Sequence, residues 1–265
     1  MSLRMKLDQQ QETRMYRSKD FLASLAGKME LEPYVKQHAT RFAKTIGEIN
    51  RYYSDPSSRR GVRLLDCGSH SGAMTIALKT LGYDAHGVDF TGVIEEFKER
   101  YNKNQIEVRS FTDPTKLPYE DGYFDCVVFA EALEHIYENP VTILTEMKRI
   151  LKVGGILVIT TPNVMRLENK LKFFLNINIY QDLFRYTHNP RFTLHFREYT
   201  RRELVTLLEK YVRMQVVRAT MFDSPAGRTY FRNMIQRILY AVNYLIPGFK
   251  TVLIAVAKKL PDGTA

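Results

Sequence analysis

The chain has 265 residues, enough for one large α/β domain with a substantial buried core. Its 39 Lys and Arg residues outnumber 29 Asp and Glu residues, giving a net charge of +10. This balance fits either a solvated basic surface or contact with a polyanion or an anionic membrane. The two cysteines fit buried thiols in a reducing compartment better than a disulfide framework. With no apolar signal segment and no apolar run of about 18 residues, the sequence predicts a cytoplasmic protein.

Residues 1–57 are predicted to form a helical extension, because apolar side chains recur there at three-to-four spacing. A linker at residues 55–58 separates it from the main domain, residues 58–260. Seven segments of that domain are predicted as strands: residues 62–66, 85–88, 106–109, 124–130, 155–160, 215–220 and 251–257. Amphipathic helices separate most of them. This alternation indicates an α/β fold, a doubly wound and mostly parallel sheet with helices on both faces.

The first strand runs into a glycine turn, Asp66-Cys67-Gly68-Ser69-His70-Ser71-Gly72, and the second strand ends in Asp89. In a doubly wound sheet, glycines at this turn let the backbone approach a ligand, and a carboxylate after the second strand takes ribose hydroxyls. The sequence therefore predicts a nucleoside site, with a helix N-cap as the alternative role for Asp89.

Two more motifs follow in order. Residues 113–125 read D-P-T-K-L-P-Y-E-D-G-Y-F-D, and residues 151–155 read L-K-V-G-G. Together with the glycine turn and Asp89, they resemble class I S-adenosylmethionine-dependent methyltransferases. The resemblance implies a Rossmann-like seven-stranded sheet, mostly parallel with a C-terminal antiparallel strand, and an N-terminal helical cap. It implies S-adenosyl-L-methionine as the cofactor.

The resemblance also implies which residues hold the cofactor. Asp89 would accept both ribose hydroxyls, and Phe90 would pack on the adenine. Asp66 and Gly68 would shape the turn beneath the methionine moiety. Four of the implied cofactor-binding residues lie at the end of the first predicted strand and in the glycine turn after it: Asp66, Gly68, Ser69 and Gly72.

Three cofactor contacts are implied further along the chain. Asp113 would accept the adenine amino group, and the backbone of Phe129 and Ala130 would meet the amino-acid end. Two positions depart from the family pattern. His70 stands where a glycine is usual, so its side chain would either crowd the ligand or point outward. Pro114 lacks the backbone N–H that often meets the adenine ring.

Acidic and histidine side chains follow the fourth predicted strand. Glu131, Glu134 and His135 have the spacing i, i+3 and i+4, so on a helical turn they would face one side at the ligand-binding edge. His195 comes before a later helix, for which Thr200 is the expected N-cap. The first cluster resembles that of ubiquinone-biosynthesis O-methyltransferases. Both clusters together resemble small-RNA 2′-O-methyltransferases.

The second resemblance implies a divalent metal held by Glu131, Glu134, His135 and His195. Mg²⁺ is compatible with two carboxylates and two imidazoles, and mixed N/O ligation suits Mn²⁺, Fe²⁺ or Zn²⁺ at least as well. The cation would orient an unactivated hydroxyl and lower its proton affinity. Two alternatives stay open. Glu134, His135 and His195 would act as a metal-free base or as substrate contacts, or the cluster would be structural.

Two segments interrupt the domain. Residues 165–190 are rich in aromatic side chains, which favours either a substrate lid over an apolar or ring-shaped acceptor or plain core packing. Residues 224–249 contain a basic amphipathic helix at 230–246. This helix would pack on its own sheet, on a second copy in a homodimer, or on an anionic membrane surface.

The sequence thus predicts O-methylation of a small-molecule, sugar, glycan-precursor or lipid-linked hydroxyl by a cytoplasmic enzyme, with peripheral membrane contact as one option. The same clusters and the charge of +10 leave an RNA ribose 2′-O-methyltransferase as the alternative. A non-catalytic binding protein that retains the fold is a third reading, motivated by His70 and Pro114. The sequence does not fix the accepting atom.

Overall fold

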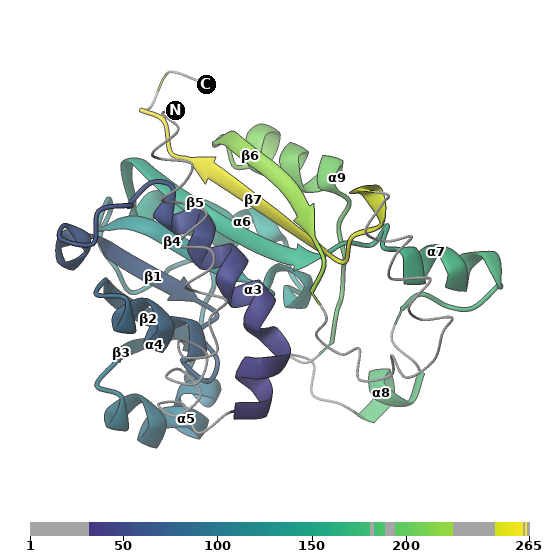
Figure 1. The fold of residues 1–265 in the computed structure, drawn as a ribbon, viewed down its shortest axis with the longest axis horizontal. Coiled ribbons are helices and arrows are strands. Elements are labelled where there is room, and N and C mark those ends of the chain that lie inside the picture. The colour runs from purple at the N-terminus through teal and green to yellow at the C-terminus, as the bar shows by residue number, and fades with distance from the viewer. Residues whose placement is uncertain (1–31, 181–182, 189–193, 225–246, 262, 264–265) are drawn as a thin grey trace.

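Seven strands form one sheet in the order β3-β2-β1-β4-β5-β7-β6. The computed structural model describes residues 32–180, 183–188, 194–224, 247–261 and 263, with the sheet at the centre (Figure 1). The strands are β1 (Arg63–Cys67), β2 (Asp84–Phe90), β3 (Glu107–Phe111), β4 (Phe124–Ala130), β5 (Leu151–Pro162), β6 (Gln215–Phe222) and β7 (Val252–Lys258). β7 runs antiparallel to β5 and β6, and the other pairs are parallel. The predicted sheet is confirmed, and each predicted strand overlaps an observed one.

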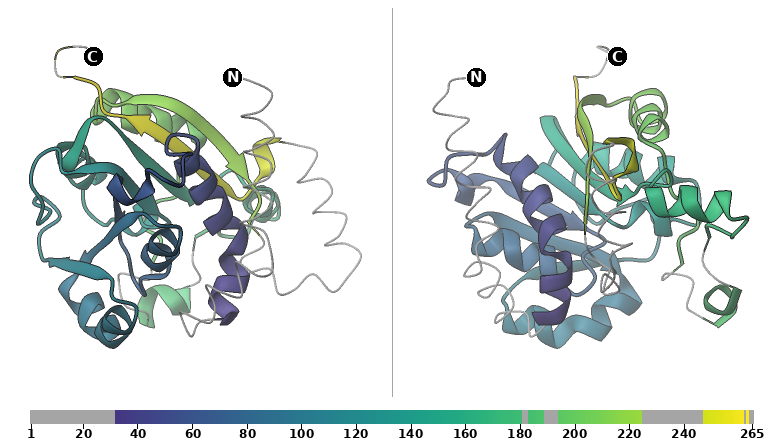
Figure 2. Two further views of the ribbon diagram at one scale, coloured as in Figure 1. Left: turned by 60° about the vertical axis from the view of Figure 1, so that its left-hand side comes forward. Right: turned by 45° about the vertical axis from the view of Figure 1, so that its right-hand side comes forward.

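Helices cover both faces of the sheet (Figure 2). They are α3 (Glu32–Asn50), α4 (Ala73–Thr80), α5 (Thr91–Lys103), α6 (Pro140–Ile150) and α9 (Arg201–Thr206). Along β1, Leu64 packs with α3 and α4, while Leu65 packs with α6 on the opposite face. This alternation follows from the period of two in a strand. Because both faces are covered, the central strands are almost continuously apolar.

The winding of the sheet reverses between β1 and β4, which are neighbours. The helix after β1, α4, lies on one face, and the helix after β4, α6, lies on the other. The loops that follow these two strands therefore diverge at the carboxyl edge of the sheet, which is where such folds bind ligands.

The N-terminal helix α3 is part of the main core. Phe42, Ile46 and Ile49 are buried in the same cluster as α4 and the sheet. Burying one isoleucine side chain stabilises the fold by about 1.5–3 kcal/mol. The helix thereby fixes its preceding turns, which carry His38 and Arg41, relative to the sheet. The domain boundary at residue 58 stays a prediction.

The region after β5 extends beyond the three layers. It contains α7 (Leu167–Phe174) and α8 (Leu183–His188), which project beside the carboxyl end of the sheet (Figures 1 and 2). Phe173 and Phe174 at the end of α7 are 80% and 87% exposed. Core packing of these aromatic side chains, one of the two readings of this segment, is therefore wrong for the described residues. The amphipathic stretch 230–246 lies outside the described residues. Within the described part, no helix is long and apolar enough to cross a membrane.

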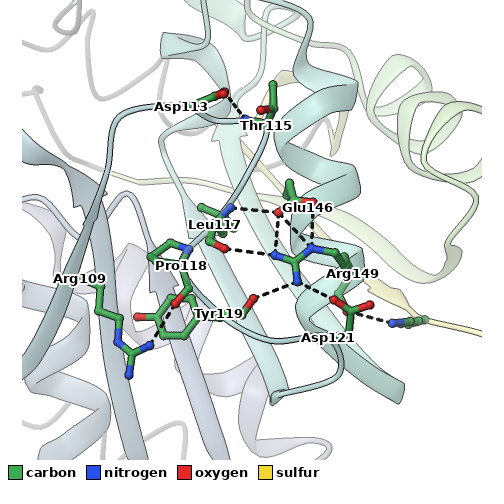
Figure 3. A network of polar contacts seen from close by, with 10 residues as sticks. Arg109, Asp113, Thr115, Leu117, Pro118, Tyr119, Asp121, Glu146 and Arg149 are labelled. Atoms are coloured by element: carbon green, nitrogen blue, oxygen red, sulfur yellow. Dashed lines mark hydrogen bonds and ion pairs between the residues drawn. The ribbon is translucent and has the colours of Figure 1, made fainter.

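Two arginines hold the connection between β3 and β4, and one of them, Arg109, donates to the Pro118 carbonyl at 3.0 Å. Arg149 extends from α6 and donates to the main-chain oxygens of Leu117 at 3.1 Å and Tyr119 at 2.9 Å (Figure 3). It also donates to Asp121 at 2.7 Å and to Glu146 at 2.8 Å. Glu146 in turn accepts the N–H of Leu117 at 3.0 Å. This network fixes the loop that carries the expected adenine contact.

Replacing Arg149 should destabilise the protein. Arg149→Met leaves two carbonyls and a half-buried carboxylate without their donor, so we expect the free energy of unfolding to fall by about 1–3 kcal/mol. Urea denaturation followed by circular dichroism measures this. The control, Arg202→Met, changes an exposed arginine on α9 and should stay within about 0.5 kcal/mol of the wild type. Equal midpoints for both variants would contradict the role of Arg149.

Candidate functional site

The loop between β1 and α4 needs glycine at both ends. Gly68 and Gly72 have φ angles of 76° and 77°, a region that glycine adopts without steric cost. A Cβ on Gly72 would lie 2.7 Å from the Ile106 side chain. The N–H of Gly68 donates to the Val88 carbonyl at 2.9 Å, which ties the loop to β2. The backbone therefore turns tightly at the carboxyl edge of the sheet.

Asp66 is buried below this loop. Its carboxylate accepts the backbone N–H of Thr75 at 3.1 Å and the Thr75 hydroxyl at 2.8 Å. Thr75 belongs to the first turn of α4, so Asp66 satisfies a donor that the helix leaves unpaired there. Burial raises the pKa of Asp66 to about 7 despite these hydrogen bonds, and the Asp89 charge adds to the rise. Asp66 thus shapes the loop by fixing the start of α4.

Asp89 joins this loop to the end of β2. One carboxylate oxygen accepts the N–H of His70 at 2.7 Å, and the other accepts the N–H of Phe90 at 2.7 Å. Burial raises the pKa of Asp89, while these two hydrogen bonds act to lower it. Each carboxylate oxygen can accept more than one hydrogen bond. The group therefore retains acceptor capacity for two further donors, as a ribose diol requires.

His70 adopts a left-handed conformation with φ 44°. Its exposed ring packs on Phe97 of α5, with 4.8 Å between ring centroids, and the Tyr101 hydroxyl donates to its carbonyl. The His70 ring therefore lies against α5.

The expected adenine contacts lie on neighbouring loops. The Phe90 ring is 42% exposed and tilts against Phe111, with 4.4 Å between centroids. Asp113 is exposed after β3, and its carboxylate accepts the N–H of Thr115 at 2.7 Å. That hydrogen bond lowers the pKa of Asp113. Both side chains therefore offer accessible groups on the β2 and β3 side of the edge.

The loops after β1 and β4 approach each other closely. A Cβ on Gly68 would lie 3.1 Å from the Ala132 Cβ and 3.9 Å from the Phe129 ring. Phe129 is buried, and Ala130 ends β4 beside it. Ser69, the last of the expected loop residues, is buried next to Gly87 of β2. The loop of residues 68–72 between β1 and α4, which we call the cofactor loop, is thus a direct neighbour of the acidic cluster after β4.

The acidic cluster does not form one helical turn as expected. Glu131 has a positive φ of 52°, and a 3₁₀ turn begins only at Leu133. Glu131 pairs instead with Arg41 of α3, at 3.4 Å between Oε2 and Nη1. The left-handed residue redirects the chain, so its side chain departs from the face shared by Glu134 and His135.

Glu134, His135 and His195 do come together. Each offers one ligand atom, and these three atoms lie within 4.8 Å of one another. The rings of His135 and His195 meet edge to face, with 4.8 Å between centroids. The Glu134 carboxylate is buried and accepts the Thr161 hydroxyl at 2.9 Å. Glu131 lies outside this group of three.

Fixed acceptors orient both imidazoles. His135 Nδ1 lies 3.0 Å from the Leu194 carbonyl, which can only accept, so Nδ1 carries the proton. His195 Nδ1 lies 3.2 Å from Glu198, which also contacts Arg166. Burial acts to raise the pKa of Glu198, but hydrogen bonds from His195 and Arg166 hold it at about 2. Glu198 is therefore ionised and accepts from Nδ1, so in the neutral form of each ring Nε2 is the acceptor atom.

Burial sets the charges of this cluster. It raises the pKa of Glu134 well above the usual value, and the Glu131 charge raises it further. It lowers the pKa of His135 to about 4, with His195 adding to the decrease. Burial thus favours the protonated carboxyl group of Glu134 and the neutral imidazole of His135.

Sequence reasoning did not single out Arg41, Arg166 or Glu198. No helical spacing brings His195 and Glu198 together, because residues 195–198 form no helix in the structure. No local sequence pattern indicates Arg41, since it lies 90 positions from Glu131 and meets it only through the packing of α3. The Thr200 N-cap is confirmed, as Thr200 and Glu203 form a reciprocal capping box.

Comparisons with known proteins show which proteins this chain is similar to. Residues 65–159 match the family model described as a methyltransferase domain. A demethylmenaquinone methyltransferase from Staphylococcus aureus is 34% identical over 112 residues, which are 41% of this chain and 46% of the relative. The chain therefore spans about half the length of the curated relatives it matches.

Two solved structures share the fold. The PH0226 protein from Pyrococcus horikoshii has a TM-score of 0.57 and 16% identity, covering 84% of this chain and 91% of its own. A SAM-dependent methyltransferase from Archaeoglobus fulgidus has a TM-score of 0.53 and 20% identity, covering 82% and 94%. The chain therefore has the fold of these structures, one of which is described as a SAM-dependent methyltransferase, and residues 65–159 are similar to a methyltransferase domain.

The protonation state of His135 can be tested directly. With a pKa of about 4, its ring should stay neutral and protonated at Nδ1 between about pH 8 and pH 5. Nuclear magnetic resonance of ¹³C,¹⁵N-histidine-labelled protein with a chelator measures this, and His135→Asn assigns the signal. The exposed His188 is the internal reference. A His135 signal that titrates near pH 6.5 would contradict the burial argument.

Proposed function

We propose that the protein methylates a hydroxyl oxygen of a small molecule, with a sugar or a lipid-linked compound as the leading acceptor class. The cluster of Glu134, His135 and His195 carries this proposal. It lies after β4 and next to the cofactor loop, because Gly68 and Ala132 are in near contact. A hydroxyl placed there would meet both the methyl donor and the free Nε2 atoms.

The crevice residues fit the adenosyl group of the donor. Asp89 retains acceptor capacity for the ribose hydroxyls, and the exposed face of Phe90 offers apolar area to the adenine. Gly68 lets the backbone come close to the ligand. Bound S-adenosylmethionine supplies a methyl group already activated by its sulfonium. The remaining task of the chain is to align and deprotonate the acceptor, and alignment alone lowers a barrier by up to about 7–11 kcal/mol.

The pKa of His135 favours metal binding over unaided base catalysis. A general base works best when its pKa is near the operating pH. At a pKa of about 4, His135 is a weak base but a ready neutral ligand. We propose that Glu134, His135 and His195 hold a divalent cation, with Mn²⁺ or Mg²⁺ as candidates. Bound there, the cation would lower the proton affinity of the hydroxyl.

The hydrogen bonds behind both histidines support this assignment. Metal-binding histidines usually donate their second ring N–H to a carbonyl or a carboxylate. Here Leu194 supplies a carbonyl for His135, and Glu198 supplies a carboxylate for His195. The alternative without metal uses His195 Nε2 as the base and His135 as a substrate contact.

An apolar acceptor is favoured by the segment after β5. More than half of the exposed large apolar side chains among the described residues lie between 171 and 186. Such a patch is typical of a ligand, membrane or partner contact. The chain of contacts from α7 to the site is short, because Arg166 and Asn169 both donate to Glu198. We therefore propose that α7 and α8 receive the acceptor or its lipid anchor, which implies peripheral membrane contact by a cytoplasmic protein.

Two alternatives have distinct tests. An RNA ribose 2′-O-methyltransferase is favoured by the charge of +10, and methyl incorporation into RNA at physiological salt would establish it. Two curated relatives are named for demethylmenaquinone, a small molecule, which supports the first reading. A non-catalytic binding protein would show no methyl transfer to any extract fraction.

Removing the metal, or one of the side chains that bind it, should strongly reduce the rate of methyl transfer. Transfer of tritiated methyl groups to a cell extract is measured before and after exhaustive chelation and after adding Mn²⁺ back. Chelation and His195→Ala should each reduce the rate about 100-fold or more. The control, His86→Gln, alters a histidine near the amino end of β2, away from the carboxyl edge. Full activity after chelation and in His195→Ala would rule out the metal site.

Substitutions at the aromatic end of α7 should reduce methyl transfer to the acceptor and leave the affinity for the cofactor unchanged. In the double variant Phe173→Ser and Phe174→Ser, methyl incorporation into the organic-soluble fraction of the extract should fall about tenfold, because two apolar contacts are lost. Affinity for S-adenosylhomocysteine, measured by calorimetry, should not change. Val153→Ser is the control, since Val153 is 62% exposed at the start of β5. Unchanged incorporation would show that the acceptor does not contact α7.

A further inference from the structure

We propose that Arg41 and Glu131 bind the amino-acid end of the methyl donor, with Arg41 taking its carboxylate and Glu131 its ammonium group. The inference rests on the proposed function, because it assumes that the crevice binds S-adenosylmethionine. It gives Glu131 a role other than the metal ligation expected from the sequence, and it gives α3 a direct part in cofactor binding.

Glu131 is held at the switch point of the sheet. It directly follows β4, and its N–H donates to the Thr160 carbonyl of β5 at 2.9 Å. Its positive φ of 52° turns the side chain away from the face that carries Glu134. The next residue, Ala132, is the one that approaches Gly68 of the cofactor loop. Glu131 thus lies one residue before the contact with the cofactor loop and three residues before Glu134 of the candidate metal cluster.

Arg41 reaches the same place from α3. The helix is fixed by buried residues on its following turns, Phe42, Ile46 and Ile49. The Arg41 guanidinium lies 3.4 Å from Glu131. Its positive charge also acts to lower the pKa of the buried Glu134. Arg41 therefore faces the carboxyl edge of the sheet.

The Arg41–Glu131 pair is built for additional partners. The two side chains are only 14% and 16% exposed, and a single contact of 3.4 Å joins them. Glu131 Oε1 is buried and receives no hydrogen bond. Burying charges is costly unless their remaining hydrogen-bonding positions are also satisfied. An ammonium group would supply the donor that Glu131 Oε1 needs.

A zwitterion matches this pair in charge and size. A guanidinium binds a carboxylate through parallel N–H donors, and a carboxylate accepts the three donors of an ammonium group. The amino-acid end of S-adenosylmethionine carries both groups on one carbon. Bound between Arg41 and Glu131, it would complete an alternating arrangement of four charges and give Glu131 Oε1 a donor.

The test compares two adenosyl ligands by titration calorimetry. S-Adenosylhomocysteine carries the amino-acid end, and 5′-methylthioadenosine lacks it. The wild type should prefer the first ligand. Arg41→Met and Glu131→Gln should each weaken S-adenosylhomocysteine binding about 10- to 100-fold and leave 5′-methylthioadenosine binding within about twofold.

Matched controls separate this role from a structural one. Arg51→Met removes an exposed arginine just past α3 that pairs with Glu48 at 3.3 Å, and it should alter neither affinity. Thermal unfolding shows whether each variant is folded. Mn²⁺ binding should be retained in Glu131→Gln and lost in His195→Ala, which distinguishes a cofactor contact from a metal ligand.

Two results would overturn the inference alone. One is equal wild-type affinity for the two ligands, and the other is an equal loss of both affinities in Arg41→Met, which would assign the pair a structural role. Loss of Mn²⁺ binding in Glu131→Gln would return Glu131 to the metal site and overturn its role here. A wild type that binds neither ligand would overturn the proposed function, and the inference would fall with it.

Discussion

The carboxylate of Asp89 is the interaction on which the candidate site depends. It accepts one backbone N–H from the β1 loop and one from the end of β2, both at 2.7 Å. These bonds fix a loop whose residues adopt left-handed conformations at Gly68, His70 and Gly72. At His70, which is not a glycine, such a conformation persists only where its surroundings determine it. The same carboxylate that organises the loop also has acceptor capacity for a ligand, so binding requires little rearrangement of the crevice.

Much of the fold could be predicted because it is encoded locally. The central strands are apolar on both faces, so Leu64 and Leu65 both read as core, and glycine turns mark where strands end. The cofactor loop was found in the same way. Glu131 was misplaced, because a helical turn assumes helical φ and its own is positive. Nothing in the residue sequence around Glu131 reveals that conformation, which depends on how the chain leaves β4 and meets α3.

Long-range partners account for the rest of what the sequence could not provide. Arg41 meets Glu131 across 90 positions, and Arg166 meets Glu198 across 32. Such pairs form only when helices pack on the completed sheet, and no spacing rule covers them. They are also the pairs that set the electrostatics of the edge. Arg166 keeps Glu198 ionised, and Glu198 holds the proton of His195 on Nδ1.

Burial couples metal binding to proton release in this cluster. Burial raises the pKa of Glu134 and lowers that of His135, so the His135 ring is neutral at neutral pH. A divalent cation needs the carboxylate, so its binding opposes the effect of burial on Glu134 and requires no proton release from His135. Arg41 acts to lower the pKa of Glu134, and the Glu131 charge acts to raise it. If the amino-acid end of the cofactor neutralises both, the two changes oppose each other at Glu134. The charges of Arg41 and Glu131 therefore link the cofactor site to the metal site through Glu134.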